Sequence, residues 1–347
     1  MVVRVLPSVN EITTGDWDNL GKPRILFESR DWLSETERSL PGEPLVTVET
    51  GAEGLDSLIV WRDLPAEHPS PYFNIGSLLA RLTASPRLAP VGWTLNCAGM
   101  EMHSQMLAAP GVEFTPARLR EHLTSAVASR ETQPIMCGVN FLPRDPAPGL
   151  PQSMAELGFH EIRGYRHAVL EIPGDSFQDY LAGLTRHRRQ NVRRERRLFT
   201  RTGQRISIAT GPGATGDDLI RLHGINRAKH GGPADEQSLR LFHSAMVRCA
   251  GDDILVIRSH LGEACVGFAM FLRDGDALHA MCVGFEDLGD QVGSYFECAY
   301  YAAVEWASRN DIREIHYGIG ATQAKTERGC QIVDVSTWYL PAEAGVQ

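Results

Sequence analysis

The 347-residue chain contains almost no lysine: of its 34 basic side chains only Lys22, Lys229 and Lys325 are Lys. Such consistent use of arginine is typical of a GC-rich genome. Exposed salt-bridge positions in this chain evidently accept Arg. A lysine differs from arginine in having a compact charge whose pKa can be tuned. Each retained lysine therefore raises the question of whether its position needs that property. Lys22 lies near the terminus and needs no such explanation. Lys229 and Lys325 are therefore the lysines of interest.

Long apolar runs and cysteine motifs are also missing. No run approaches the roughly 20 apolar residues that a membrane-spanning helix needs, and residues 1–19 lack the apolar core of a signal peptide. We therefore expect a cytoplasmic protein with no membrane partner. The seven cysteines form no CxxC pair and are odd in number, which argues against a disulfide framework or a structural zinc site. We expect no metal and no resident cofactor.

Positive charge is concentrated in one segment, YLAGLTRHRRQNVRRERRLFTR (Tyr180–Arg201). Its Arg186–Arg201 part has eight arginines against the single Glu195, a charge of +7, so with −9 for the whole chain the remainder carries −16. The segment is rich in residues that tolerate helix well, and it has no Pro or Gly after Leu184. We therefore predict a helix. Its apolar stripe holds Leu181, Leu184, Val192 and Phe199, and a different face gathers Arg186, Arg189, Arg193, Arg196 and Arg197.

This basic helix has two interpretations. Charge runs are usually just solvated faces. However, like charges three and four residues apart weaken an isolated helix. A polyanion such as an RNA backbone neutralises them and releases counterions. The second interpretation predicts that these five arginines bind tRNA, and no DNA partner is expected.

The order of the predicted elements divides the chain into two domains. The boundary is IPGDS (Ile172–Ser176), where Pro and Gly precede a capped helix, giving domains 1–172 and 173–347. The first half has strands, one clear helix at Pro116–Ser129, and more strands. The second half has the order helix, strand, two helices, three antiparallel strands, a long apolar helix at Gly293–Asn310, strand, loop, strand. The fold class is therefore α/β (α+β), with each domain a mixed, mainly antiparallel sheet flanked by helices.

Four segments of the second half carry a resemblance to a known group. They are Leu184–Arg197, Lys229-His230-Gly231 with Leu241-Phe242, Ser294–Ala307 with Ile315–Gly320, and Lys325 with Gly329. In these segments and in element order, the chain from about Asp175 onward resembles the tandem-GNAT group. That group includes the Fem-type peptidoglycan bridge aminoacyltransferases and aminoacyl-tRNA-dependent transferases of natural-product pathways. The resemblance implies two tandem GNAT-like domains, the first a degenerate copy. The chain departs from the group at His316-Tyr317-Gly318, where the group commonly has Asp-Phe-Gly, so the role of that acid is not carried over.

Two donors are compatible with this fold. GNAT enzymes that use acyl-CoA hold its pyrophosphate with a Q/R-x-x-G-x-G/A loop at a helix N-terminus, because glycines let backbone N–H groups approach phosphate. The corresponding segment, EDLGDQVGSYF (Glu286–Phe296), has Gly289 and Gly293 but no Arg or Gln at the required spacing. Its Asp287 and Asp290 would repel a pyrophosphate. An aminoacyl-tRNA fits the basic helix better, with the unpaired acceptor end recognised by shape.

The candidate catalytic residues lie near the last two strands. Lys325 is predicted to act as an electrostatic stabiliser or proton carrier, and Tyr317 and His316 are candidates for acid and base. Strand alternation lets only one of these two face the cleft. The alternative is a core aromatic for Tyr317 and a surface polar residue for His316.

Two further pairs are predicted to bind substrate. Lys229 and His230 contact either the donor phosphates or the acceptor. Tyr72 and Asn74 lie in a Pro-punctuated loop, where they either present an aromatic ring and an amide to a ligand or anchor the loop.

These observations predict an acyltransferase that moves an aminoacyl group from a charged tRNA to an amine of a small-molecule acceptor, in natural-product biosynthesis rather than wall synthesis. The reaction needs alignment of the amine, removal of its proton and stabilisation of an oxyanion. The alternative is an acyl-CoA-dependent GNAT N-acyltransferase. A non-catalytic RNA-binding protein would keep the basic helix but would not need Lys325.

Overall fold

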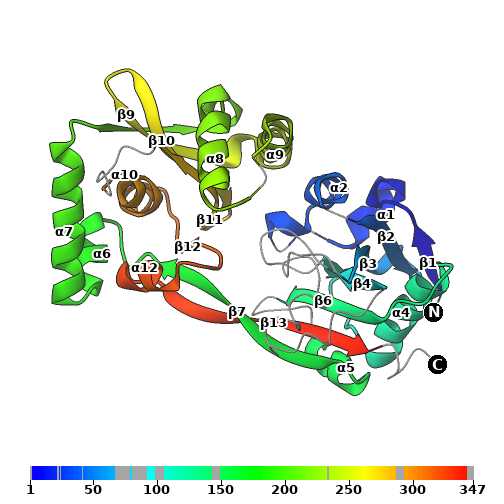
Figure 1. The fold of residues 1–347 in the computed structure, drawn as a ribbon. Helices are drawn as coiled ribbons and strands as arrows, with labels where there is room; N and C mark the ends of the chain where they lie inside the picture. The colour runs from blue at the N-terminus through cyan, green and yellow to red at the C-terminus, as the bar shows by residue number, and fades with distance from the viewer. Residues whose placement is uncertain are drawn as a thin grey trace. The chain divides into compact units, whose positions relative to one another are not determined.

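The computed structural model describes residues 2–21, 23, 25–40, 42–66, 79, 92–97, 105–142, 149–232, 234–286 and 293–341. The chain divides into two compact units (Figure 1). Unit 1 is Met1–Tyr165 with Asp334–Gln347, and unit 2 is Arg166–Val333. The domain ranges 1–172 and 173–347 expected from the sequence stay a proposal. Among the helices of the described ranges, none has the length and apolarity needed to span a membrane.

Unit 1 is built on a mixed sheet. Neighbouring strands pair in the order β1 (Val3–Leu6), β2 (Glu43–Thr50), β3 (Leu55–Pro65), β4 (Trp93–Cys97), β6 (Met136–Leu142) and β13 (Gln331–Pro341), with β5 (Met106–Ala108) on β3. All these pairs are antiparallel except β4–β6. The helical segments are η1 (Val9–Glu11), α1 (Thr14–Asn19), η2 (Leu26–Glu28), α2 (Arg30–Ser39), α4 (Pro116–Ala128) and α5 (Leu150–Glu156).

Helix α4 provides much of the core of unit 1. Its N-cap Thr115 accepts a hydrogen bond from the Arg118 backbone N–H, and Pro116 occupies the first helical position, as predicted. Its buried face, which includes Leu119 and Leu123, joins one apolar cluster with Trp61 of β3. Burying such side chains contributes about 1.5–3 kcal/mol each.

The strands of unit 2 also show mixed pairing. Its strands pair in the order β7 (His160–Glu171), β12 (Glu314–His316), β11 (Ala277–Phe285), β10 (Ala264–Asp274), β9 (Ile254–Leu261) and β8 (Arg205–Thr210). All pairs are antiparallel except β11–β12. The helical segments are α6 (Phe177–Gly183), α7 (Arg186–Arg201), η4 (Pro212–Ala214), α8 (Asp217–Lys229), α9 (Glu236–Ala250), η5 (Gly251–Asp253), α10 (Gly293–Phe296), the π-helical turn η6 (Glu297–Tyr301), α11 (Ala302–Ala307) and α12 (Thr322–Glu327).

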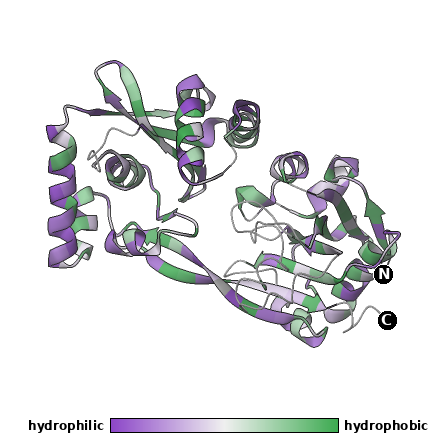
Figure 2. Ribbon diagram, viewed as in Figure 1, coloured by the Kyte–Doolittle hydropathy of each residue, from purple (hydrophilic) through white to green (hydrophobic). Residues whose placement is uncertain are grey.

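A continuous helix formed by α10, η6 and α11, here called the central helix, fills the core of unit 2. Its apolar residues occur on all sides, and it is buried in one cluster with the sheet and with α6 and α7. Gly293 begins this helix directly against α7, since a Cβ there would lie 3.0 Å from the backbone nitrogen of Phe199. In Figure 2, α7 is mostly hydrophilic.

The basic segment forms two helices where the sequence predicts one. Helix α6 ends at Gly183, Leu184 is extended, and Thr185 caps α7 by accepting a hydrogen bond from the Arg188 backbone N–H. Gly has low helix propensity, and a Thr side chain competes well for an N-cap. The prediction of one helix across residues 180–201 is therefore wrong at this junction.

Candidate functional site

The parallel strands β11 and β12 separate after a very short pairing. Ala277–His279 pairs with Glu314–His316, and β11 then continues to Phe285 without β12. Alternation along β12 sends Ile315 and the following Tyr317 toward the central helix, and Glu314 and His316 toward the opposite face of the sheet. His316 thus lies at the point where the strands part, on a polar face.

Three histidines from adjacent strands meet on that face. His316 Nδ1 lies 3.0 Å from Nε2 of His167 on β7, and His316 Nε2 lies 2.8 Å from a carboxylate oxygen of Glu314. The ring of His279 on β11 stacks on His316 with centroids 4.6 Å apart. His279 Nε2 is 3.8 Å from the Asp274 carboxylate. We call Glu314, His316 and His167 the histidine relay.

The hydrogen bonds of the relay fix its tautomers when the rings are neutral. The Glu314 carboxylate accepts from Nε2–H of His316, so Nδ1 of His316 accepts from Nε2–H of His167. This leaves Nδ1 of His167 with a lone pair. That atom is buried and has no hydrogen-bond partner within the described residues. Burial, with the nearby His316, lowers the pKa of His167 to about 4, so its imidazole is neutral at pH 7.

Lys325 holds the chain that follows β12. Its Nζ donates to the carbonyls of Tyr317 (2.7 Å), Gly318 (3.0 Å) and Ile319 (2.9 Å). An ammonium has three protons, and all are used here. The side chain is buried, and this burial lowers the pKa of Lys325 to about 8. In this arrangement Lys325 positions the strand end, and no proton remains for a substrate.

Tyr317 faces the core. Its ring stacks on Tyr300 of the central helix with centroids 4.5 Å apart, and its hydroxyl has no hydrogen-bond partner among the described residues. Burial raises the pKa of Tyr317 well above its usual value. The strand alternation that the sequence left open therefore places His316, and not Tyr317, on the polar face.

Helix α7 has one solvent face made of basic residues. Because an α-helix turns every 3.6 residues, one stripe gathers five exposed arginines: Arg186, Arg193, Arg194, Arg197 and Arg201. We call this stripe the arginine face. None of its members forms an ion pair within the part of the chain that the structure describes. Three of them, Arg186, Arg193 and Arg197, are among the predicted tRNA-binding residues.

The other two predicted tRNA-binding arginines are engaged by the protein. Arg196 makes a bidentate pair with Glu297, with its closest contact at 2.7 Å, and also reaches Glu305 (3.2 Å). Arg189 is half-buried and donates to the Leu181 carbonyl (3.1 Å). Both belong to the inner side of α7 because the central helix and α6 pack there. Their guanidinium groups are structural in this arrangement.

The inner side of α7 also contains a buried ion pair with a residue far along the sequence. Glu195 accepts two hydrogen bonds from Arg328 (2.8 and 2.9 Å) and one from the Tyr301 hydroxyl. The Arg328 guanidinium lies 3.2 Å from the ring centroid of Phe296. Arg328 is only 3% exposed, so Glu195 compensates a buried charge.

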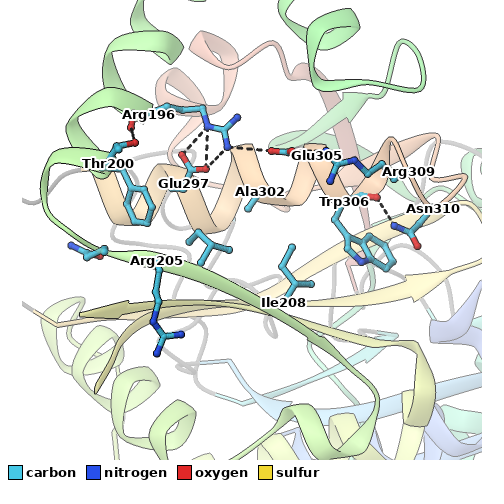
Figure 3. A pocket seen from close by; sticks show the side chains of 13 residues that line it. Arg196, Thr200, Arg205, Ile208, Glu297, Ala302, Glu305, Trp306, Arg309 and Asn310 are labelled. Atoms are coloured by element: carbon cyan, nitrogen blue, oxygen red, sulfur yellow. Dashed lines mark hydrogen bonds and ion pairs between the residues drawn. The ribbon is translucent and has the colours of Figure 1, made fainter. Parts of the chain in front are cut away.

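A pocket of about 390 Å³ lies beside α7 (Figure 3). Its walls come from α7, β8 and the central helix, with Ile206, Ile208 and Trp306 among the apolar lining residues and the Arg196–Glu297 pair at one side. It lies on the central-helix side of the sheet, whereas the histidine relay lies on the opposite side. The pocket and the relay are therefore separate features.

The predicted substrate-binding residues are not part of the relay. Lys229 and His230 are exposed at the C-terminal end of α8. Tyr72 and Asn74 lie outside the described residues. The relay members His167 and Glu314, and the stacked His279, were missed by sequence reasoning. In the sequence, each of them is recognisable only as a polar residue within an apolar strand. They come together only because the strands that contain them pair.

The comparisons with known proteins agree on fold and family. A model of the FemAB-like family, described as peptidoglycan biosynthesis/recognition, matches residues 106–347. The structure is similar to that of FemX (TM-score 0.59, 10% identity, 97% of each chain covered). It is also similar to a tandem GNAT protein from the clavulanic acid biosynthesis pathway (TM-score 0.56, 14% identity, 99% of each chain covered).

A third similar structure is the C-terminal domain of a putative lysylphosphatidylglycerol synthetase from Agrobacterium fabrum (TM-score 0.54, 11% identity, 91% of this chain and 89% of that one covered). No curated protein sequence matches the chain. At these identities the structural similarity concerns the fold alone. The predicted fold class, tandem GNAT-like domains, and the predicted resemblance to Fem-like proteins are confirmed.

Proposed function

Because this chain belongs to the FemAB-like family of peptidoglycan biosynthesis/recognition proteins, we propose that it is an acyltransferase that moves an aminoacyl group from a charged tRNA to an amine of a small-molecule acceptor. The expected setting is natural-product biosynthesis. The single observation that carries the choice of donor is the arginine face of α7, which presents five cations without a carboxylate partner among the described residues.

The arginine face matches what a tRNA backbone requires. Phosphate binding needs several cations spread along a surface, and each phosphate contact contributes to a salt-dependent affinity. Several other exposed arginines of unit 2 have carboxylate partners, as in Arg221–Glu286 and Arg240–Asp217. The contrast supports a role for the arginine face in binding a polyanion.

The N-terminus of the central helix is poorly suited to bind the pyrophosphate of acyl-CoA. Gly293, the glycine expected to give a pyrophosphate access to backbone N–H groups, packs against the α7 backbone at Phe199. Its missing side chain is thereby explained by close packing of two helices. The acidic residues before it add electrostatic repulsion. Both points favour tRNA over CoA as donor.

The histidine relay supplies the base for the proposed reaction. As the acceptor nitrogen forms its bond to the ester carbonyl carbon, Nδ1 of His167 takes a proton from it, and Glu314 orients the relay through His316. The carbon–oxygen bond to the terminal ribose then breaks, and the ribose oxygen leaves with the proton from the His167 imidazolium. A buried nitrogen without a partner costs about 1–3 kcal/mol, and a substrate N–H would relieve this cost.

Lys325 is assigned a positioning role in this proposal. By holding three successive carbonyls after His316, it fixes the end of β12 and thereby the geometry of the relay. The roles first expected for Lys325 and Tyr317, proton carrier and acid, are less compatible with a saturated ammonium and a buried hydroxyl.

A donor assay tests the proposal. The purified chain is incubated with candidate amines and tRNA charged with labelled amino acids, with and without prior nuclease treatment, and in parallel with acyl-CoA. We expect product that depends on intact charged tRNA. Product that survives nuclease and requires acyl-CoA would make this an acyl-CoA-dependent GNAT. RNA binding without product from either donor would leave a non-catalytic RNA-binding protein.

A further inference from the structure

A second histidine pair lies in unit 2, away from the relay, where α8, α9 and β11 converge. Nδ1 of His223 on α8 is 3.2 Å from Nε2 of His243 on α9. The Sγ of Cys282 on β11 completes a group in which this sulfur and one ring nitrogen of each histidine all lie within 4.8 Å of one another. Cys282 is not in a disulfide. Three separate elements thus each direct one soft or borderline ligand atom to the same point.

Both imidazoles are in the protonation state that binds metal. His223 is 6% exposed and His243 is 3% exposed. Burial lowers the pKa of each to about 4, and His243 and Arg227 lower that of His223 further, whereas Asp218 acts in the opposite direction on His243. At pH 7 each ring is therefore neutral and has one lone pair. Metal ligands must be deprotonated in this way.

The spacing of the two nitrogens suits a tetrahedral ion. Two histidine nitrogens that are each about 2.0–2.1 Å from a tetrahedral Zn²⁺ lie about 3.3 Å apart, close to the 3.2 Å between His223 and His243. A tetrahedral ion places the sulfur about 3.6 Å from each nitrogen. Since the atoms lie within 4.8 Å of one another, the sulfur approaches each nitrogen by about 1.2 Å at most. Two apolar rings flank the site: the ring centroid of Phe242 is 5.4 Å from that of His223, and the ring centroid of Phe268 is 6.2 Å from that of His243. Such a shell limits solvent access and strengthens the metal–ligand bonds.

We propose that this chain binds one Zn²⁺ through Nδ1 of His223, Nε2 of His243 and Sγ of Cys282, with a fourth position left for water. Binding converts the Cys282 thiol to a thiolate and releases one proton. The ring that donates the hydrogen bond between the histidines moves its N–H to its other nitrogen, and both rings stay neutral. The ion replaces a single hydrogen bond between α8 and α9 with bonds that also fix both helices to β11. The odd cysteine count and the lack of a CxxC pair concealed this site, because its ligands are far apart in sequence.

The site is tested by metal titration of the full chain. The protein is stripped with a chelator and dialysed, and bound zinc is then measured after gel filtration. In parallel, Co²⁺ is added as a spectroscopic substitute. We expect one zinc per chain, an intense visible spectrum typical of tetrahedral Co²⁺, and a near-ultraviolet sulfur-to-cobalt charge-transfer band. Zinc should also raise the melting temperature of the stripped protein.

Matched variants separate this site from adventitious binding. Cys282→Ser should remove the charge-transfer band and weaken zinc binding by more than the roughly 10–100-fold that outer-shell changes cost. Cys265→Ser on β10 should leave both unchanged. His243→Gln tests the second ligand, and circular dichroism checks that it still folds. Less than stoichiometric zinc in the wild-type chain, or equal zinc affinity in Cys282→Ser and Cys265→Ser, would overturn the proposal. Neither result depends on whether the protein transfers an acyl group.

Discussion

At the residue scale, the proposed chemistry depends on the direction of single side chains on a three-residue strand. His316 and Tyr317 are neighbours, yet one joins a polar cluster on the sheet and the other stacks on Tyr300 in the core. Pleating of a strand reverses the environment at each residue. The core side can therefore contain a large aromatic ring while the opposite side collects three imidazoles.

Replacing His167 by Gln should lower kcat/KM about 100- to 10,000-fold, the range that a general base contributes. The affinity for tRNA should not change, because helix α7 is not altered. His160→Gln, at the other end of β7 and outside the relay, is the matched control and should retain activity. Glu314→Gln should lower kcat less than His167→Gln. Equal activity of His167→Gln and the control in a steady-state assay would remove the relay from the mechanism.

Lys325→Met should reduce kcat by up to about 100-fold, because small misplacements of catalytic groups have costs of this size. The three carbonyls after β12 would lose their shared donor, so the strand end would shift. Gln323→Ala, on the exposed side of the same α12, should have little effect. If Lys325→Met instead raises KM for the acceptor at unchanged kcat, the ammonium contacts substrate and does not simply position the strand.

At the scale of elements, α7 combines two charge environments on one helix. Its inner side is neutralised through Arg196–Glu297 and Glu195–Arg328, and its arginine face is left uncompensated. Like charges on that face destabilise the helix slightly. Tertiary packing of Val192 and Phe199 offsets this cost, because both are buried.

The triple change Arg193→Gln, Arg197→Gln and Arg201→Gln should weaken tRNA binding and reduce the slope of log K against log salt by about 2–3. The helix should remain folded, because only exposed side chains change. The matched control replaces Arg205, Arg221 and Arg240, which are also exposed but are paired with carboxylates. Filter binding at several salt concentrations measures both slopes, and identical slopes would exclude the arginine face as the tRNA contact.

Glu195→Gln should lower the free energy of unfolding by about 3–5 kcal/mol, the usual cost of leaving a buried charge unpaired. Arg328 would keep at most one acceptor oxygen on the amide and would lose the negative charge that compensates its own. The comparison is Glu263→Gln, whose partner Arg205 is exposed and whose loss should be nearly neutral. Urea unfolding measures both variants. Replacing Glu195 by Leu and Arg328 by Met in the same chain should recover most of the lost free energy of unfolding. If it does not, the ion pair stabilises the fold by more than the neutralisation of two buried charges.

At the scale of the whole molecule, the loss of folding stability at acid pH depends on histidines that both units bury in neutral form. Burial lowers the pKa of four of them to about 4: His122, His167, His223 and His243. Their pKa in the unfolded chain is the ordinary 6.5. Between pH 6.5 and 4 the unfolded chain therefore binds protons that the folded chain does not, so stability falls as pH falls through this window.

For the fully buried His122, the shift from 6.5 to about 4 is equivalent to about 3 kcal/mol at most. His122→Gln should flatten the decline of the urea midpoint between pH 6.5 and 4, because one proton-binding difference is removed. His230→Asn, at an exposed histidine, should leave the decline unchanged. A steeper decline in His122→Gln than in the wild-type chain would contradict this account.

Sequence patterns predicted most of the element order of unit 2, the amphipathic α4 and the basic character of α7, because periodicity and propensity act over neighbouring residues. The loop predicted between the last two strands was wrong, because Thr322–Glu327 forms helix α12. They also pointed to the region of His316 and Lys325, although not to their environments. They missed the break before Thr185, where one capping hydroxyl outweighs the helix-favouring residues around it. They also failed to distinguish Arg196 from Arg197, since a carboxylate on the central helix decides which arginine is neutralised.

The sequence by itself determined the fold class, the family resemblance and the presence of a highly basic helix, since each depends on local composition and order. Only the tertiary structure decided which arginines remain free for a polyanion, which way His316 faces, and that His167 and Glu314 complete a relay with it. These are properties of residues up to 149 positions apart. Hydrogen bonds and charge neutralisation act through space, and the pairing of β7, β11 and β12 sets those distances.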